Sequence, residues 1–290
     1  MGAGAGTGVE AGVGTGAGTG AGTGPGIGAG AEAARRRALA AAEARFSTVL
    51  GELVAELALL RTPMAPGAPL PRGQIARRMD RAVRPHAAGF VTRMAAVAGA
   101  VADTVLAAMV AAAPLQRAYA NNGGDIALHL APGARYAIGV SDHRGARLGQ
   151  VTLEAGQGVG GIATSGRHGR SLSLGIADSV TVLAENAAAA DAAATLVANA
   201  VDLPGHPGIA RTPASALDPD SDLGERPVVT GCRGLAADEA AAALAAGAAR
   251  AEAMRRAGLI AGAALFLEGQ VRTVGRLDAA ALAAPAAEPA

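Results

Sequence analysis

Residues 161–195 read GIATSGRHGRSLSLGIADSVTVLAENAAAADAAAT, and this stretch decides the fold. Its first glycine completes a GxGxxG pattern over 156–161, and Asp178 follows at the distance where a dinucleotide-binding fold places its ribose ligand. That fingerprint binds pyrophosphate only where the last glycine opens a helix. Residues 162–175 contain three more glycines and no 3.6-residue apolar period. The sequence therefore argues against a dinucleotide-binding loop.

The rest of the chain alternates between helical and strand patterns. Helices are predicted over 33–60, 73–87, 92–112, 187–200 and 237–257. Strands are predicted within 117–142, 147–155 and 179–186 and as a last hairpin over 259–275, with a polar loop over 210–227. Asn186 can cap the helix that follows it. Because helices precede, interrupt and follow the strands, the predicted class is α+β, with mixed helices and antiparallel strands.

Two of these helices carry further expectations. In the first, the residues at helical spacing that predict its core-facing stripe are Phe46, Val49, Leu50, Leu53, Leu57 and Leu60. The stretch 94–115 has nearly the length of a membrane span. It is mostly alanine and carries Asp103 near its middle, which favours a buried helix of a soluble protein.

Composition bounds the domain organisation and location. The chain has 290 residues, and we predict a single domain over 37–276. The Gly/Ala-rich segment 1–36 and the Ala/Pro-rich tail 277–290 are expected to be disordered, because such repeats cannot offset their ordering entropy. The N-terminal segment lacks a basic region and a compact leucine-rich stretch. We therefore expect no signal peptide and a cytoplasmic protein.

Composition also excludes several kinds of chemistry. The chain contains no lysine, which removes P-loop and Schiff-base chemistry. Its net charge is +1 and only 2% of its residues are aromatic, which argues against nucleic-acid binding. Cys232 is the single cysteine, so neither an internal disulfide nor a cysteine-based zinc site can form.

Three segments together resemble the ApbE-like superfamily, whose best-known members are FAD:protein FMN transferases. They are MAAVAGAVAD (94–103), NNGGDI (121–126) and the opening stretch 161–195, in which ATSG is followed by VTV and ADxxAT. Their order and spacing are most similar to the superfamily's shorter, uncharacterised branch, where a Met-Ala-Ala-Val-Ala-Gly helix, an Asn-Gly-Gly-Asp turn and a Ser-Leu-Ser segment recur. The resemblance covers the chain between residues 75 and 275 and implies a single ApbE-like α+β domain.

Asp191 and Thr195 are the candidate metal ligands. They lie four residues apart on one helix, so their oxygens share a face, and one carboxylate with one hydroxyl suits a hard cation that keeps waters and phosphate oxygens. The resemblance implies that they hold Mg²⁺ against the pyrophosphate of FAD. The residues alone also fit an ordinary helix in which Thr195 bonds back to a carbonyl and Asp191 is solvated.

Two turns contain the candidate cofactor-binding residues, which are Asn122, Gly123, Gly124, Asp125, Thr164, Ser165 and Gly166. Read alone, the first turn is only a hairpin connection, and the resemblance places it beside the flavin-nucleotide cleft. The second turn can offer hydroxyls and N–H groups to a phosphate or flavin edge, although a polar turn between strands needs no ligand. Arg170, in the loop that follows, can pair with phosphate or form part of a solvated rim.

The chain departs from the transferase pattern in two places. The transferases have a Lys-Gly-x-x-x-Asp element that ends where Asp103 stands here, but the lysine position is Ala98. Their His-x-x-Asp-Pro segment between TSG and VTV is replaced by SLSLGIAD. The nearest acidic cluster is Asp218, Asp220 and Asp222. That cluster lacks the glycine and glutamate of a calcium loop, so we interpret it as a polar turn.

The resemblance implies a small-molecule nucleotide ligand, FAD or a related flavin, with Mg²⁺. One hypothesis is a Mg²⁺-dependent flavin or phosphoryl-type transferase, in which a hydroxyl attacks a phosphoanhydride. The alternative is a non-catalytic ligand-binding or structural homologue that has lost FMN transfer. The two departures favour weak or absent protein flavinylation. No membrane partner is expected, and a homo-oligomer is left open.

Overall fold

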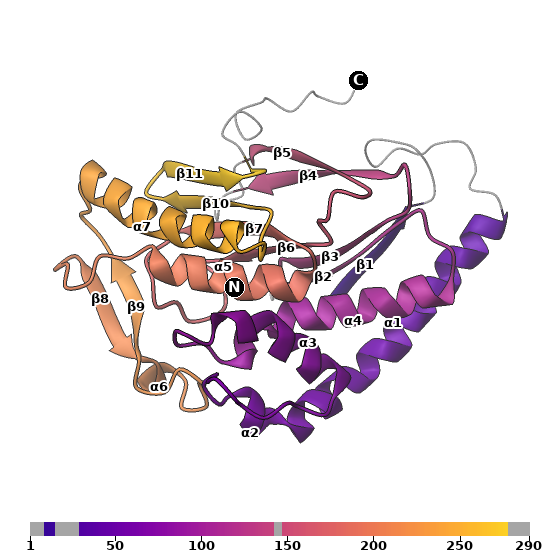
Figure 1. Ribbon diagram of the computed structural model, residues 1–290, viewed down its shortest axis with the longest axis horizontal. Helices are drawn as coiled ribbons and strands as arrows, with labels where there is room; N and C mark the ends of the chain where they lie inside the picture. The colour runs from indigo at the N-terminus through magenta and orange to yellow at the C-terminus, as the bar shows by residue number, and fades with distance from the viewer. Residues whose placement is uncertain (1–8, 15–28, 142–146, 278–290) are drawn as a thin grey trace, which may run out of the picture.

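The computed structural model in Figure 1 describes residues 9–14, 29–141 and 147–277. Its centre is a seven-stranded sheet in which all neighbouring strands are antiparallel, in the order β1-β2-β3-β6-β7-β10-β11. The strands are β1 (Val9–Gly14), β2 (Arg117–Asn122), β3 (Asp125–Leu130), β6 (Gly161–Ser165), β7 (Ser179–Ala184), β10 (Gly262–Leu267) and β11 (Gln270–Gly275). The inner strand β7, SVTVLA, is buried along its whole length, as its β-branched composition favours.

Two separate ribbons flank this sheet. The strands β4 (Arg135–Ser141) and β5 (Arg147–Glu154) pair with each other, as do β8 (Ile209–Pro213) and β9 (Pro227–Cys232). The predicted polar loop over 210–227 is therefore wrong in part, because β8, a short helix and the start of β9 lie within it. Prolines at the ends of β8 and β9 and the acidic turn between them hide this ribbon from a pattern based on alternation.

Helices cover one face of the sheet. The α-helices of the described residues are α1 (Ala29–Ala55), α2 (Leu57–Leu60), α3 (Gln74–Val83), α4 (Val97–Ala112), α5 (Ala187–Ala200), α6 (Ala214–Leu217) and α7 (Ala237–Arg256). Figure 1 shows α4, α5 and α7 lying along the sheet, where α4 packs on β2 and β3, α5 on β6 and β7, and α7 on β10 and β11. α1 packs on α4, and α3 lies against α4 and α5. The α+β class with antiparallel strands is thus confirmed.

Small residues let α4 and α5 approach closely. A Cβ atom at Gly99, near the start of α4, would lie 2.2 Å from the carbonyl oxygen of Ala187, the first residue of α5. That distance is far below any van der Waals contact, so only glycine permits this approach. α5 itself is mostly alanine, and most of its alanines are buried against α4 and the sheet.

The helix expected within 94–115 is buried, as predicted. Residues Arg93–Ala112 have a mean hydropathy of 1.9 and the length to cross a membrane, but 56% of that window is buried inside the fold. A short 3-10 helix, Arg93–Ala96, opens the segment, and α4 then packs against α1, the sheet and α5. Length and apolar composition therefore reflect a core helix here.

The core-facing stripe predicted for the first helical segment is confirmed in part, because Val49 and Leu60 are buried and Leu53 packs against the core. Phe46 is 42% exposed and Leu50 is 73% exposed, so these two positions of the predicted stripe are wrong. The buried residues of α1 are Ala34, Ala38, Ala42 and Val49. The helix lies against α4, whose surface is built of small residues, and alanines permit the closest contact there.

The terminal expectations fall largely outside the described residues. Residues 1–8, 15–28 and 278–290 are not among them, so the disorder expected there stays a prediction, as do the domain boundaries. Within 1–36, however, residues 9–14 form β1, which pairs with β2 along its length, and α1 begins at Ala29. Strand pairing uses backbone groups, which glycine and alanine carry like any other residue, so low complexity did not prevent it.

Asp178 has a structural role. Its carboxylate lies 2.6 Å from Nη2 of Arg167 and accepts a hydrogen bond of 2.7 Å from the N–H of Glu268, in the turn between β10 and β11. Residues 161–165 form β6 and no helix follows them. Rejection of a dinucleotide-binding loop is therefore confirmed.

Candidate functional site

The site is built on a junction between the amino-terminal ends of α4 and α5. Asp103, on α4, accepts hydrogen bonds of 3.0 Å from the N–H groups of Ala187 and Ala188, the first two residues of α5. In return Asp191, on α5, accepts one of 3.0 Å from the N–H of Gly99 on α4. Each carboxylate satisfies N–H groups that a helix end leaves free and lies at the positive end of a helix dipole.

A pocket of about 410 Å³ opens beside this junction, and we call it the acidic pocket. Its wall is formed by the start of α4, the start of β3, the loop after β6, one face of α5 and the loop after α6. Five aspartates and two arginines line it, which are Asp125, Asp191, Asp218, Asp220, Asp222, Arg61 and Arg170. The predicted metal ligands Asp191 and Thr195 both lie in this wall.

Asp191 and Asp125 act on each other electrostatically. Burial raises the pKa of Asp191 well above its usual range, and the nearby Asp125 carboxylate raises it further, while the N–H groups of Gly99 and Ala98 oppose both effects. Burial also raises the pKa of Asp125 to about 7, against the opposing N–H of Thr164 and the charge of Arg170. Two desolvated carboxylates that repel each other in this way are stabilised by a cation between them.

The Thr195 hydroxyl is available for a ligand. It makes no hydrogen bond to any residue within the described parts of the chain. By contrast, the Thr104 hydroxyl bonds back to the carbonyl of Ala100 at 2.7 Å, which is the ordinary behaviour of threonine inside a helix. The interpretation of Asp191 as a solvated surface carboxylate and of Thr195 as a back-bonded hydroxyl therefore does not describe this helix.

Only one side chain of the turn between β2 and β3 faces the acidic pocket. Asn122 donates from Nδ2 to the carbonyl of Ala98 at 3.2 Å and so fixes the start of α4. Gly123 has a φ of +70°, and a Cβ atom there would lie 1.7 Å from Nη2 of Arg170, so the guanidinium rests on the glycine. Gly124 borders a smaller cavity of about 100 Å³. Asp125 alone of the four predicted residues lines the acidic pocket.

The TSG turn, residues 164–166, lies outside the wall of the acidic pocket. The Thr164 side chain bonds to the Thr181 hydroxyl at 2.9 Å and lines the smaller cavity, while its N–H acts on Asp125. Ser165 is half-buried at the end of β6. Gly166 is buried where a Cβ atom would lie 2.5 Å from the carbonyl oxygen of Asp178. None of these three side chains lines the acidic pocket, whereas Arg170 in the next loop does.

The acidic loop after α6 is part of the pocket wall and not only a polar turn. Asp222 accepts a hydrogen bond from the hydroxyl of Thr92, just before α4. Asp220 lies 3.9 Å from the guanidinium of Arg61. Among the described residues no cluster of three or more His, Cys, Asp or Glu side chains could hold a metal ion by itself. A cation here would therefore need ligands beyond protein carboxylates.

These features define an ApbE-like α+β domain with an acidic pocket at a helix junction. The model of the family described as AbpE bacteria matches residues 26–273, and the chain belongs to that family. The resemblance inferred from the segments 94–103, 121–126 and 161–195 is thereby confirmed, together with its shorter, uncharacterised branch.

Curated relatives of this chain are UPF0280 proteins. A UPF0280 protein of Methanopyrus kandleri is 39% identical over 127 residues, which is 43% of this chain and 48% of the relative. A UPF0280 protein of Methanothermobacter thermautotrophicus is 36% identical over 132 residues, 45% of this chain and 49% of the relative. The chain thus spans about half the length of these curated relatives.

Two flavin transferases have also been solved that are similar to this chain at low identity. The apo form of the flavinyl transferase ApbE of Pseudomonas stutzeri has a TM-score of 0.37 at 17% identity, covering 67% of this chain and 52% of its own. The flavin transferase ApbE of Vibrio cholerae has a TM-score of 0.34 at 16% identity, covering 84% and 75%. Family membership rests on the sequence match and not on these superpositions.

Sequence reasoning missed the partners that reach the site from far along the chain. It assigned Asp125 to a cofactor turn and not to a carboxylate pair with Asp191. It also gave Asp103 no capping role and treated the acidic loop as a turn. The one local signal was charge, because Asp103 is a lone carboxylate inside an apolar helix and such a group needs a partner.

Proposed function

We propose that the acidic pocket binds Mg²⁺ together with the phosphates of FAD or a related nucleotide. The observation that supports this most directly is the pair of carboxylates Asp125 and Asp191, which are both desolvated and repel each other. The Thr195 hydroxyl, which has no hydrogen-bond partner among the described residues, lines the same pocket. A divalent cation would turn that repulsion into attraction. The residues therefore fit the cation that the family implies.

The donor set suits Mg²⁺ in particular. All three groups present hard oxygen atoms, and Mg²⁺ is usually held by one or two carboxylates, several waters and substrate phosphates. The Oδ2 atom of Asp191 is engaged by the N–H of Gly99, which orients the carboxylate. When bound, the cation would neutralise phosphate charge in a pocket where aspartates outnumber arginines.

The arginines and the pocket size are also compatible with a nucleotide. Arg170 is held against the glycine turn at Gly123, and Arg61, at the carboxyl end of α2, also lines the pocket. Guanidinium groups recognise phosphate oxygens in a bidentate manner. A volume of about 410 Å³ falls in the usual range for small-molecule sites.

We further propose that transfer of FMN to a protein threonine is weak or absent. Ala98 lines the acidic pocket at the position where the resemblance implies a lysine, and its methyl group can neither donate a proton nor bind phosphate. A transferase that acts on a different acceptor, or a binding protein without transfer, both agree with this pocket. For flavin chemistry, Ala98 favours a binding protein without transfer, because it lacks the amino group of the lysine.

Native mass spectrometry tests the proposed binding. The full chain is mixed with FAD and MgCl₂, and we expect one FAD and one Mg²⁺ per chain. The variants Asp191→Asn and Thr195→Val should lose the Mg²⁺ adduct, whereas Asp238→Asn, which removes an exposed charge in the first turn of α7, should keep it. A chain that binds neither FAD nor Mg²⁺ would contradict the proposal.

A further inference from the structure

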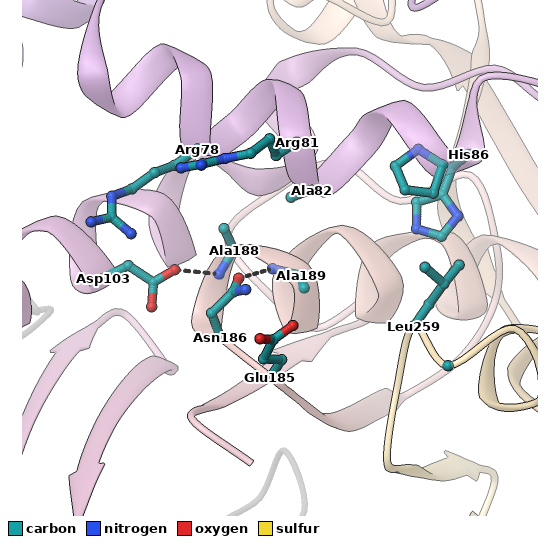
Figure 2. Close-up of a pocket in the computed structure, with 12 residues that line it drawn as sticks. Arg78, Arg81, Ala82, His86, Asp103, Glu185, Asn186, Ala188, Ala189 and Leu259 are labelled. Carbon is teal, nitrogen blue, oxygen red and sulfur yellow. Dashed lines mark hydrogen bonds between the residues drawn. The ribbon is translucent and has the colours of Figure 1, made fainter. Parts of the chain in front are cut away.

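A second cavity, of about 420 Å³, shares no lining residue with the acidic pocket. It lies between α3 with the turn that follows it, the start of α5, and the link from α7 to β10 (Figure 2). The amino end of α5 is not free to bind anything there. Asp103 accepts from Ala187 and Ala188, and Asn186 accepts from Ala189 at 2.9 Å.

Two arginines of this cavity lack a hydrogen-bonded partner among the described residues. Arg78 and Arg81 lie three residues apart on α3, so their side chains share a face. Neither makes a hydrogen bond or an ion pair with any residue in the described part of the chain. The Nε atom of Arg78 is shielded from solvent and unpaired. The charge of Arg78 acts on Asp103, but both oxygens of that carboxylate are already engaged by α5.

His86 is a third unpartnered polar group. Its side chain lines the cavity from the turn after α3, and Figure 2 shows its ring pointing toward Leu259. It is only 5% exposed, and its ring makes no hydrogen bond to any described residue. Burial and the charge of Arg250 lower its pKa to about 4, so the ring is neutral near pH 7. A neutral imidazole offers one donor and one acceptor.

A buried polar group without a partner is rare, because its lost hydration is not replaced. The Nε atom of Arg78 is such a group, and the His86 ring, which makes no hydrogen bond, and the exposed guanidinium of Arg81 lie on the same cavity. We propose that this cavity is a second ligand site, which binds a small molecule through a carboxylate or phosphate group held by Arg78 and Arg81, with His86 contacting the same molecule.

The charges of the wall narrow the class of ligand further. Glu185 and Asp103 also line the cavity, so its two arginines are offset by two carboxylates. A molecule with a single anionic group is therefore accommodated better than a polyanion such as a nucleoside triphosphate. The acidic pocket is proposed to bind phosphates only together with Mg²⁺, whereas this cavity holds an anion directly through its arginines. The two sites can therefore be tested separately.

Nuclear magnetic resonance of the histidine rings tests this site. Acetate and inorganic phosphate are titrated into the full-length protein, and the ring signal of His86 is assigned by its loss in His86→Asn. We expect a saturable shift of that signal with a Kd of about 1 mM or tighter for at least one probe. A stronger response to acetate would indicate a carboxylate ligand, and a stronger response to phosphate would indicate a phosphate ligand. ATP should bind more weakly than the better probe.

Four variants separate a built site from a general charge effect. Arg78→Gln and Arg81→Gln should each weaken the His86 response at least tenfold, whereas Arg72→Gln, which removes an exposed positive charge just before α3, should leave it unchanged. Asp191→Asn should also leave it unchanged. An unresponsive His86 signal with both probes, or a response in Arg78→Gln and Arg81→Gln as strong as that of the wild type, would overturn the proposal. Arg81 is exposed, so its variant is expected to fold even where Arg78→Gln does not.

Discussion

Asp103 and Asp191 cap each other's helices. Asp103 on α4 accepts the first two N–H groups of α5, and Asp191 on α5 accepts the N–H of Gly99 at the start of α4. The two helix ends are therefore fixed against each other through the buried carboxylate of Asp103 and the half-buried carboxylate of Asp191. The same arrangement places Asp191 in the wall of the acidic pocket, so the helix junction and the proposed cation site are one structural unit.

Removing one half of this exchange should destabilise the fold. Asp103→Ala leaves the N–H groups of Ala187 and Ala188 buried without acceptors, which we expect to lower the free energy of unfolding by about 1–3 kcal/mol. Asp238→Ala, at an exposed position in the first turn of α7, should cost less than about 1 kcal/mol. Urea denaturation of the two variants measures the difference. Equal losses would show that the Asp103 cap does not stabilise the junction.

Two glycine-to-alanine substitutions should change the free energy of unfolding in opposite directions. Gly99→Ala places a Cβ atom 2.2 Å from the Ala187 carbonyl oxygen and forces α4 and α5 apart, with an expected cost of about 1–3 kcal/mol. Gly51→Ala lies inside α1 with nothing within 4 Å of the new atom. Its higher helix propensity should add about 0.5–1 kcal/mol of stability. Thermal melts of both variants measure these changes. An unchanged melting temperature in Gly99→Ala would contradict the close packing of α4 on α5.

His86 should make stability depend on pH. Its pKa is about 4 in the folded chain and 6.5 when unperturbed. Between these values the unfolded chain binds a proton that the folded chain excludes, so stability falls as pH decreases from about 6.5 to about 4, by up to about 3 kcal/mol. The free energy of unfolding of the wild type minus that of His86→Asn should decrease over this window. Asp125 and Asp191, which titrate with the opposite sign, are present in both proteins and cancel.

Protein flavinylation should be weak or absent. Ala98 stands where the resemblance implies a lysine, and SLSLGIAD replaces the His-x-x-Asp-Pro segment. The chain is incubated with FAD, Mg²⁺ and a threonine-containing acceptor peptide, and the peptide is examined for flavin fluorescence after denaturing electrophoresis. Robust labelling would show that the missing groups are not required.

Local chemistry explains which parts of the fold could be predicted from sequence. The helix over 187–200 and its Asn186 cap were predicted with the bounds that the structure shows, because a cap and an apolar period lie within a few residues. The buried face of α1 was predicted only in part, since large apolar residues such as Leu50 dominate a periodicity pattern while alanines and Val49 make the contact. The ribbon of β8 and β9 was missed because strand pairing across the intervening residues 214–226 leaves no local pattern.

The candidate site shows the same limit. Asp191 and Thr195 share a helical turn, so their proximity follows from spacing alone. Asp125 and the acidic loop after α6 reach the same pocket only through the sheet order and the packing of α4 on α5. Nothing in the sequence near Asp125 indicates that its carboxylate faces Asp191. Arg78, Arg81 and His86 likewise converge through tertiary packing.

The most direct test of the account is the Mg²⁺ dependence of FAD affinity, measured by isothermal titration in the wild type and in Asp191→Asn. We predict that Mg²⁺ strengthens FAD binding at least tenfold in the wild type, about 1.4 kcal/mol, and by less than about twofold in the variant. The melting temperature of the ligand-free variant should be unchanged or higher, because the asparagine keeps an acceptor for Gly99 and removes the repulsion with Asp125. An equal Mg²⁺ effect in both proteins, or no FAD binding in either, would contradict the account.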